Sequence, residues 1–223
     1  MTKITLMLAG IIASAIFLCG NLYAQSSQKD GDWQFWSAAS VEKTLNDYLK
    51  AVFEVEVRFG DDINRYIYQS EDAGIVYAAF DWLDLGANFR YVLADNGGQW
   101  EHEARPHLNA TLKAKYLGAD ISNRSRFEYR YLTRTKDTGR YRNLTEIMLP
   151  LEWSVLEISP FVREEAFLKF DQDDYNENRL SSGASFKIAK NLKMEFYYLW
   201  QRLKSVGKWK DINVLGTQLK LLF

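Results

Sequence analysis

The last eleven residues of the chain, NVLGTQLKLLF (213–223), carry the pattern that decides the fold. Successive side chains of an extended chain point to opposite faces, so residues two apart share a face. Here one face is mostly apolar, the other is mixed, and the chain ends on an aromatic residue inside the run. The first face comprises Asn213, Leu215, Thr217, Leu219, Leu221 and Phe223, and the second comprises Val214, Gly216, Gln218, Lys220 and Leu222. A half-apolar extended run of this kind is typical of a strand in a β-barrel.

The same period of two recurs from Trp33 onward, interrupted by polar or glycine-containing breaks such as Asp95-Asn96-Gly97-Gly98. The alternating runs number about eleven, whereas bacterial transmembrane barrels have even strand numbers. Either a short strand is missing from this count or one run is wrongly divided, with 64–69 as the place in question, so we expect about ten to twelve strands. The predicted fold class is all-β, an antiparallel up-and-down transmembrane β-barrel preceded by a cleavable signal peptide. The alternating runs are 33–44, 51–59, 73–82, 83–93, 104–116, 119–132, 141–153, 157–170, 179–187, 192–204 and 213–223.

The N-terminal residues have the pattern of a secretory signal peptide. Lys3 gives a positive start, the segment from Ile4 to Leu18 is apolar, and Leu22-Tyr23-Ala24 ends in the small residue that signal peptidase favours. The apolar segment is shorter than the roughly 20 residues that a membrane-spanning helix needs. We therefore expect a signal peptide at 1–24, a polar linker at 25–32 and a β-barrel domain at 33–223.

Composition excludes several classes of protein. The chain has 223 residues, of which 15% are aromatic, and its formal net charge is −1. It is too aromatic for a disordered chain, its mean hydropathy of −0.31 is too low for a helical membrane protein, and the charge gives no basis for a nucleic-acid partner. The single cysteine, Cys19, lies in the expected signal peptide, so the mature chain offers no disulfide or thiol chemistry.

Alternation alone leaves open whether the apolar face points outward into lipid or inward, as in soluble lipocalin-like barrels. The polar face favours the outward arrangement, because its opposite charges would pair inside a narrow barrel. Aromatic residues near run ends, such as Trp33, Trp82 and Tyr116, are expected at membrane interfaces. The expected lumen-lining residues, called here the charge ladder, are Glu54, Glu56, Arg58, Arg90, Arg105, His107, Arg124, Arg126, Glu128, Arg130, Glu146, Arg163, Glu165, Arg179 and Glu195.

Three prolines fall inside the alternating runs: Pro106, Pro150 and Pro160. Proline cannot donate to a strand ladder, and a closed barrel has no free edge to accommodate it. We therefore expect each proline to mark a bulge or a strand end near the rim.

Two features of the sequence resemble known proteins. The terminal Phe223 after an alternating apolar run resembles the terminal assembly signal of bacterial outer-membrane barrels. Most of the mature chain also resembles a bacterial family catalogued as domain of unknown function 2490, which implies an outer-membrane β-barrel and supplies no activity or catalytic residue. The residues that carry this resemblance are Trp33-Gln34-Phe35-Trp36, Glu54-Val55-Glu56-Val57-Arg58-Phe59, Phe89-Arg90-Tyr91, Arg105-Pro106, Asn123-Arg124-Ser125-Arg126, Glu128-Tyr129-Arg130, Tyr141-Arg142-Asn143, Pro160, Asn178-Arg179 and Phe196-Tyr197-Tyr198.

The sequence contains few candidate residues for catalysis or metal binding. The two histidines are His102, expected in a loop, and His107, expected to make lumenal hydrogen bonds. No serine has a local signature of a nucleophile, and the acidic segments at 61–62 and 171–174 lack the glycine and distal glutamate of a calcium loop. We therefore assign no catalytic residue, no metal site and no cofactor.

The charge ladder leaves three functional interpretations open. It can be a structural network that fills the lumen, the lining of a narrow pore for small ions or anionic solutes, or part of a ligand or enzyme site. The preferred hypothesis is a narrow channel or a structural barrel in the bacterial outer membrane. Its partners are outer-membrane lipid, the barrel-assembly machinery that recognises Phe223, and small solutes. The alternatives are a lipid-modifying, deacylase-like outer-membrane enzyme and a soluble periplasmic binding protein.

Overall fold

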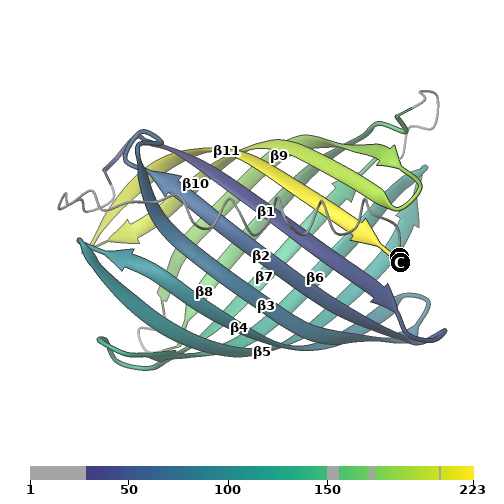
Figure 1. The fold of residues 1–223 in the computed structure, drawn as a ribbon, viewed down its shortest axis with the longest axis horizontal. Coiled ribbons are helices and arrows are strands. Elements are labelled where there is room, and N and C mark those ends of the chain that lie inside the picture. The colour runs from purple at the N-terminus through teal and green to yellow at the C-terminus, as the bar shows by residue number, and fades with distance from the viewer. Residues whose placement is uncertain (1–28, 150–155, 171–173, 206) are drawn as a thin grey trace, which may run out of the picture.

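The computed structural model describes residues 29–149, 156–170, 174–205 and 207–223. The expected signal peptide, residues 25–28 of the expected linker, Pro150 and Trp153 lie outside the described residues. Within those residues, eleven β-strands form one closed barrel (Figure 1). They are β1 (Asp32–Thr44), β2 (Leu49–Gly60), β3 (Arg65–Phe80), β4 (Leu83–Asn96), β5 (Gln99–Tyr116), β6 (Ala119–Leu132), β7 (Thr138–Met148), β8 (Ser159–Lys169), β9 (Asp174–Ala189), β10 (Leu192–Ser205) and β11 (Lys208–Leu222).

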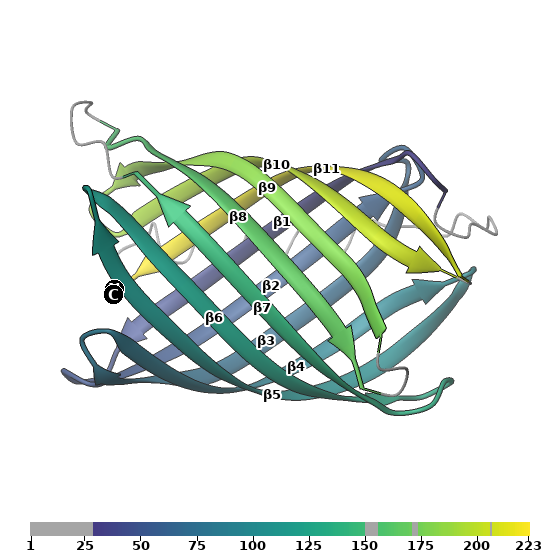
Figure 2. The ribbon, with the colours of Figure 1, turned by 180° about the vertical axis from the view of Figure 1, so that it is seen from behind.

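Each strand pairs antiparallel with its sequence neighbours, and the barrel closes where β1 pairs with β11. This closing pair is parallel, because an odd number of alternating strands leaves the first and last running in the same direction (Figures 1 and 2). The pairing extends to the end of the chain, where Phe223 N donates to Glu42 O at 2.9 Å and Thr44 N donates to Phe223 O at 2.8 Å. We call the β1–β11 pair the seam.

The strand number therefore lies in the expected range, but the expectation of an even number is wrong. No separate strand forms near 64–69 in the described chain, because Arg65–Phe80 is one continuous strand that pairs with β2 and β4. Its polar first half resembles a loop in sequence because Gln69 and Glu71 interrupt the apolar pattern on its outer face.

The apolar face points outward, as the sequence predicted. Exposed outer residues include Phe53, Leu108 and Phe127. On each strand, the residues that alternate with the outward-facing ones point into the lumen. Among the described residues, 21 buried side chains are polar or charged and only eight are apolar. This is the reverse of a soluble barrel, which keeps its apolar face inside. No described helix is long and apolar enough to cross a membrane.

The two described prolines behave differently from each other. Pro160 is the second residue of β8, at a strand end as expected. Pro106 lies well inside β5, and the expectation of a bulge there is wrong, because the register from Ala104↔Tyr131 to His107↔Glu128 has no shift. The proline is tolerated because the β5–β6 ladder skips it without changing register.

Candidate functional site

The structure places all fifteen charge-ladder residues on the inner face of the barrel, distributed over β2, β4, β5, β6, β7, β8, β9 and β10. Residues on alternate strands are close enough for ion pairs because long arginine side chains reach across the strand between them. Most of the ladder divides into four groups, each built around a shared carboxylate or guanidinium.

Glu165 on β8 is the centre of the first group. Arg142 donates to its Oε1 from Nε at 3.0 Å and from Nη2 at 2.7 Å, so two nitrogens of one guanidinium share a single carboxylate oxygen in charge-assisted hydrogen bonds. Nη2 of Arg124 and Nη1 of Arg179 lie 3.5 and 3.8 Å from the two carboxylate oxygens. Arg142 also approaches Glu128 at 3.6 Å, so one arginine joins two carboxylates.

Arg90 on β4 is the centre of the second group. Its Nε donates to Asp72 at 2.7 Å and its Nη2 donates to Glu54 at 3.0 Å. Glu56, 3.8 Å from Arg90, accepts a 2.8 Å hydrogen bond from Arg58. Three carboxylates therefore surround one guanidinium, which offsets much of the cost of burying it.

The third and fourth groups lie on opposite sides of the barrel. Glu103 accepts hydrogen bonds from Arg105 at 2.6 Å and from two nitrogens of Arg130 at 2.8 Å. Glu195 accepts from Lys220 at 2.6 Å and from Arg163 at 3.0 Å.

Aromatic side chains inside the lumen pack against the guanidinium groups. Phe167 is fully buried, with Arg142 and Arg179 each 4.7 Å from its ring centre. Arg58 lies 3.6 Å from the ring of Trp36, and Arg179 reaches the same ring from β9 at 4.9 Å. Because β9 and β1 are not neighbours in the sheet, this last contact crosses the lumen. Arginine is suited to this packing because its flat, weakly hydrated group stacks on rings.

The charges are not evenly neutralised along the ladder. Arg126 donates to Asn109 Oδ1 at 2.7 Å, yet no carboxylate among the described residues lies within ion-pair distance. On the same strand, Arg124 Nε is buried without a hydrogen-bond partner in the described structure. The inner face of β6 therefore has a local excess of positive charge.

Sequence reasoning missed several charged residues of the same network. Asp72, Glu103 and Glu177 lie between the predicted alternating runs, because their outward-facing neighbours Glu71, His102 and Asn178 are polar and hide the contrast between the two faces. The predicted ladder also omits Arg140 and Arg142, which contact Glu128 and Glu165 from the inner face of β7. Counting back in steps of two from Glu146 would have placed both on the inner face.

The histidines lie in different environments. The side chain of His107 is fully buried in the lumen, with Nε2 at 3.5 Å from Asp72 and Nδ1 at 3.4 Å from the Arg105 carbonyl oxygen. It is enclosed away from the outer wall. His102 lies inside β5, not in the expected loop, and its Nδ1 is 2.5 Å from the hydroxyl of Tyr91. No cluster of three potential metal ligands occurs in the described part of the chain.

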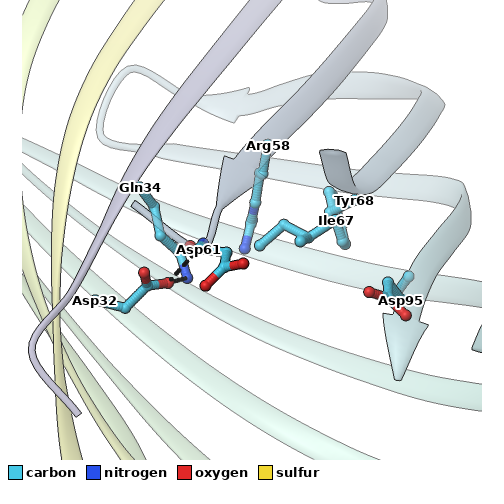
Figure 3. A pocket seen from close by; sticks show the side chains of 8 residues that line it. Asp32, Gln34, Arg58, Asp61, Ile67, Tyr68 and Asp95 are labelled. Carbon is cyan, nitrogen blue, oxygen red and sulfur yellow. Dashed lines mark hydrogen bonds between the residues drawn. The ribbon is translucent and has the colours of Figure 1, made fainter. Parts of the chain in front are cut away.

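A cavity of about 110 Å³ opens near the start of β1 (Figure 3). Its carboxylates already have structural partners. Asp32 accepts from Gln34 at 2.8 Å and from the Asp62 amide at 2.9 Å, which holds the β2–β3 turn. Asp61 pairs with Lys29 at 2.6 Å and raises the pKa of that lysine, and Asp95 pairs with Arg65. The remaining lining residues are Arg58, Ile67, Tyr68 and Ala94.

The barrel is similar in fold to several solved structures. The solved structure of the NanC porin matches with a TM-score of 0.50 and 10% identity, over 82% of this chain and 93% of that one. LpxR from Salmonella typhimurium matches with a TM-score of 0.47 and 7% identity, over 78% and 83%. An anion-selective porin from Comamonas acidovorans matches with a TM-score of 0.39 and 11% identity, over 77% and 56%. These likenesses concern the fold.

No curated protein matches the sequence. A family model described as "Protein of unknown function (DUF2490)" matches residues 33–212, which is most of the barrel. The resemblance found in the sequence is thereby confirmed, and the chain belongs to the DUF2490 family.

Proposed function

We propose that this protein is an outer-membrane β-barrel whose lumen is closed by its own charge network, and that it does not serve as an open diffusion pore. The observation that carries the proposal is the burial of the ladder. Glu195, Glu128 and Arg105 expose only 1%, 3% and 5% of their surface although they face the lumen from three different strands. Side chains that line a water-filled channel would be accessible to water.

The exposed apolar outer wall supports placement in a membrane, because no soluble protein of this size leaves such a belt uncovered without cost. Membrane lipid would then contact the apolar outer wall of the barrel. Phe223 ends the seam with 46% of its surface exposed, a position where assembly machinery can reach it. A signal peptide at 1–24 would direct export.

The test is conductance of the refolded protein in a planar lipid bilayer. The wild-type barrel is expected to give no discrete current steps. The double variant Arg142→Ala with Arg179→Ala removes side chains that reach into the lumen and is expected to conduct. Lys115→Ala, on a rim side chain that is 83% exposed, is the matched control and should remain silent. Discrete, reproducible steps from the wild type would overturn the closed-lumen proposal.

A narrow anion-selective channel is the second candidate, favoured by the uncompensated charge on β6. A positive lumen wall attracts anions and repels cations. If the wild type conducts, its reversal potential in a KCl gradient should indicate anion preference, and Arg126→Gln should reduce that preference. A cation-preferring or unselective current would exclude this candidate.

A further inference from the structure

One region of the outer wall does not follow the apolar pattern. On β6, β7, β8 and β9, a set of outward-facing residues is polar, and we call it the wall patch. Its members are Asn123, Ser125, Tyr141, Asn143, Thr145, Glu164 and Asn178. Their outward direction follows from alternation, because Arg124, Arg126, Arg142 and Glu165 between them point into the lumen.

The register gathers the wall patch into two adjacent rows. Asn123, Thr145 and Glu164 are direct partners across β6, β7 and β8. The next row consists of Ser125, Asn143, Ala166 and Asn178. The same rows continue onto β5 as Leu112 and Ala110, where the wall is apolar again. The wall patch is therefore contiguous and bounded, and Figure 2 shows its four strands side by side on one side of the barrel.

The centre of the wall patch lies at mid-height. Asn143 and Glu164 are the central residues of the eleven-residue strands β7 and β8. In a membrane this is the depth of hydrocarbon, where polar groups have no water and carboxylates are costly. Lipid headgroups do not reach this depth, so lipid alone cannot satisfy Glu164.

The amides and hydroxyls already form a network. Asn123 Nδ2 donates to Asn143 Oδ1 at 2.9 Å, Asn143 Nδ2 donates to Asn123 Oδ1 at 3.0 Å, and Ser125 and Tyr141 hydroxyls are 2.8 Å apart. Glu164 accepts a hydrogen bond from Asn178. The Asn123 amide has used both of its donors, on Asn143 Oδ1 and on Thr145 Oγ1 at 2.9 Å each. The hydroxyls of Ser125, Tyr141 and Thr145 keep further hydrogen-bonding capacity, and each oxygen of the Glu164 carboxylate can accept more than one hydrogen bond.

We propose that the wall patch is the interface for a second copy of this chain within the membrane. Such an interface requires groups that donate and accept at the same depth, and an identical barrel related by a two-fold axis along the membrane normal presents them. With the axis near β7, β8 of one copy lies opposite β6 of the other. The carboxylate of Glu164 then meets the Ser125 hydroxyl of the second copy as a donor. Ala166 and Ala110 within the rows allow the two walls to approach closely, as small residues do in membrane interfaces.

This inference rests on the membrane placement proposed above, and cross-linking in isolated membranes separates the two. Because the only cysteine lies at position 19, single cysteines can be introduced as probes. Ala166→Cys lies in the wall patch, and Ala73→Cys is its matched control in the apolar wall of β3. A short bifunctional maleimide should link Ala166→Cys into a dimer of twice the chain mass and leave Ala73→Cys monomeric.

A second variant tests the polar groups directly. Asn143→Leu with Glu164→Leu, in the Ala166→Cys background, should weaken dimerisation by about tenfold or more, because membrane interfaces lose affinity with each hydrogen bond removed. Heat-dependent migration on a detergent gel should show that the barrel is still folded. Absence of a dimer from a membrane-embedded Ala166→Cys protein, equal products from both cysteines, or a product of another mass would overturn the inference. Absence of the protein from membranes would instead overturn the proposed location.

Discussion

The inner wall of the barrel has two unlike arcs. From β2 round to the start of β10 it is filled by arginine and carboxylate groups in ion pairs. Near the seam, Trp36, Leu199, Ile212 and Val214 form an apolar cluster on β1, β10 and β11. The charged arc depends on directional contacts between strands close in sequence, whereas the seam joins residues as much as 180 positions apart. Closing so long a chain costs conformational entropy, and a non-directional apolar cluster offsets that cost without demanding exact charge geometry.

The largest expected effect is at the seam. Trp36→Ala removes a ring that is 3% exposed and supports both the apolar cluster and two guanidinium groups. It should lower the free energy of unfolding by about 3–5 kcal/mol, as for buried aromatic residues in general. Trp33→Ala, on the same strand but 44% exposed on the outer wall, is the matched control. Urea unfolding of the refolded barrels measures both, and equal losses would show that the cluster has no special role.

A smaller effect is expected in the charged arc. Glu195→Gln keeps the shape of a buried side chain but removes the charge that faces Arg163 and Lys220. The loss should be about 1.5–3 kcal/mol, the size of a hydrogen bond to a charged group. Glu157→Gln, which breaks the exposed pair with Lys187, should cost at most about 1 kcal/mol in the same unfolding measurement. Equal costs would mean that the lumen screens charges as water does.

The smallest loss of stability is expected where β9 and β10 pack closely, at a position that carries no charge. Tyr197 lies over Gly183 and Gly216, and a Cβ at position 183 would lie 2.2 Å from the backbone oxygen of Phe196. Gly183→Ala should therefore cost about 1–3 kcal/mol through overpacking. Gly86→Ala is the control, because its nearest neighbour is a side-chain amide at 3.3 Å. If Gly183→Ala unfolds at the wild-type urea concentration, the close approach of β9 and β10 is not a constraint.

Parts of the site could be read from alternation and parts could not. Glu54, Glu56 and Arg58 fall in a clean alternating run, so their common face was predictable. Asp72 and Glu177 pair with ladder residues, yet their sequence neighbourhoods resemble loops. The neighbouring outward-facing residues Glu71 and Asn178 are also polar, so the contrast between faces on which the prediction depends is lost there.

The wall patch shows a second limit of sequence reasoning. Asn143 and Thr145 appear in sequence as polar members of a mainly apolar face. Single polar residues of this kind carry little information, because many barrels contain them. Only the register places Asn123, Thr145 and Glu164 in one row, and that adjacency turns scattered residues into a surface.

The sequence by itself determined the β architecture, because a period of two specifies which side chains share a face. The charges of the polar face indicated the outward direction of the apolar faces, and the order of short motifs along the chain indicated the family. The tertiary structure alone decided that eleven strands close through a parallel seam, that Trp36 enters the lumen, and which arginine meets which carboxylate. Those features depend on register and on the number of strands around the barrel. Both emerge only when distant strands pair, since alternation within a strand contains no information about its partner.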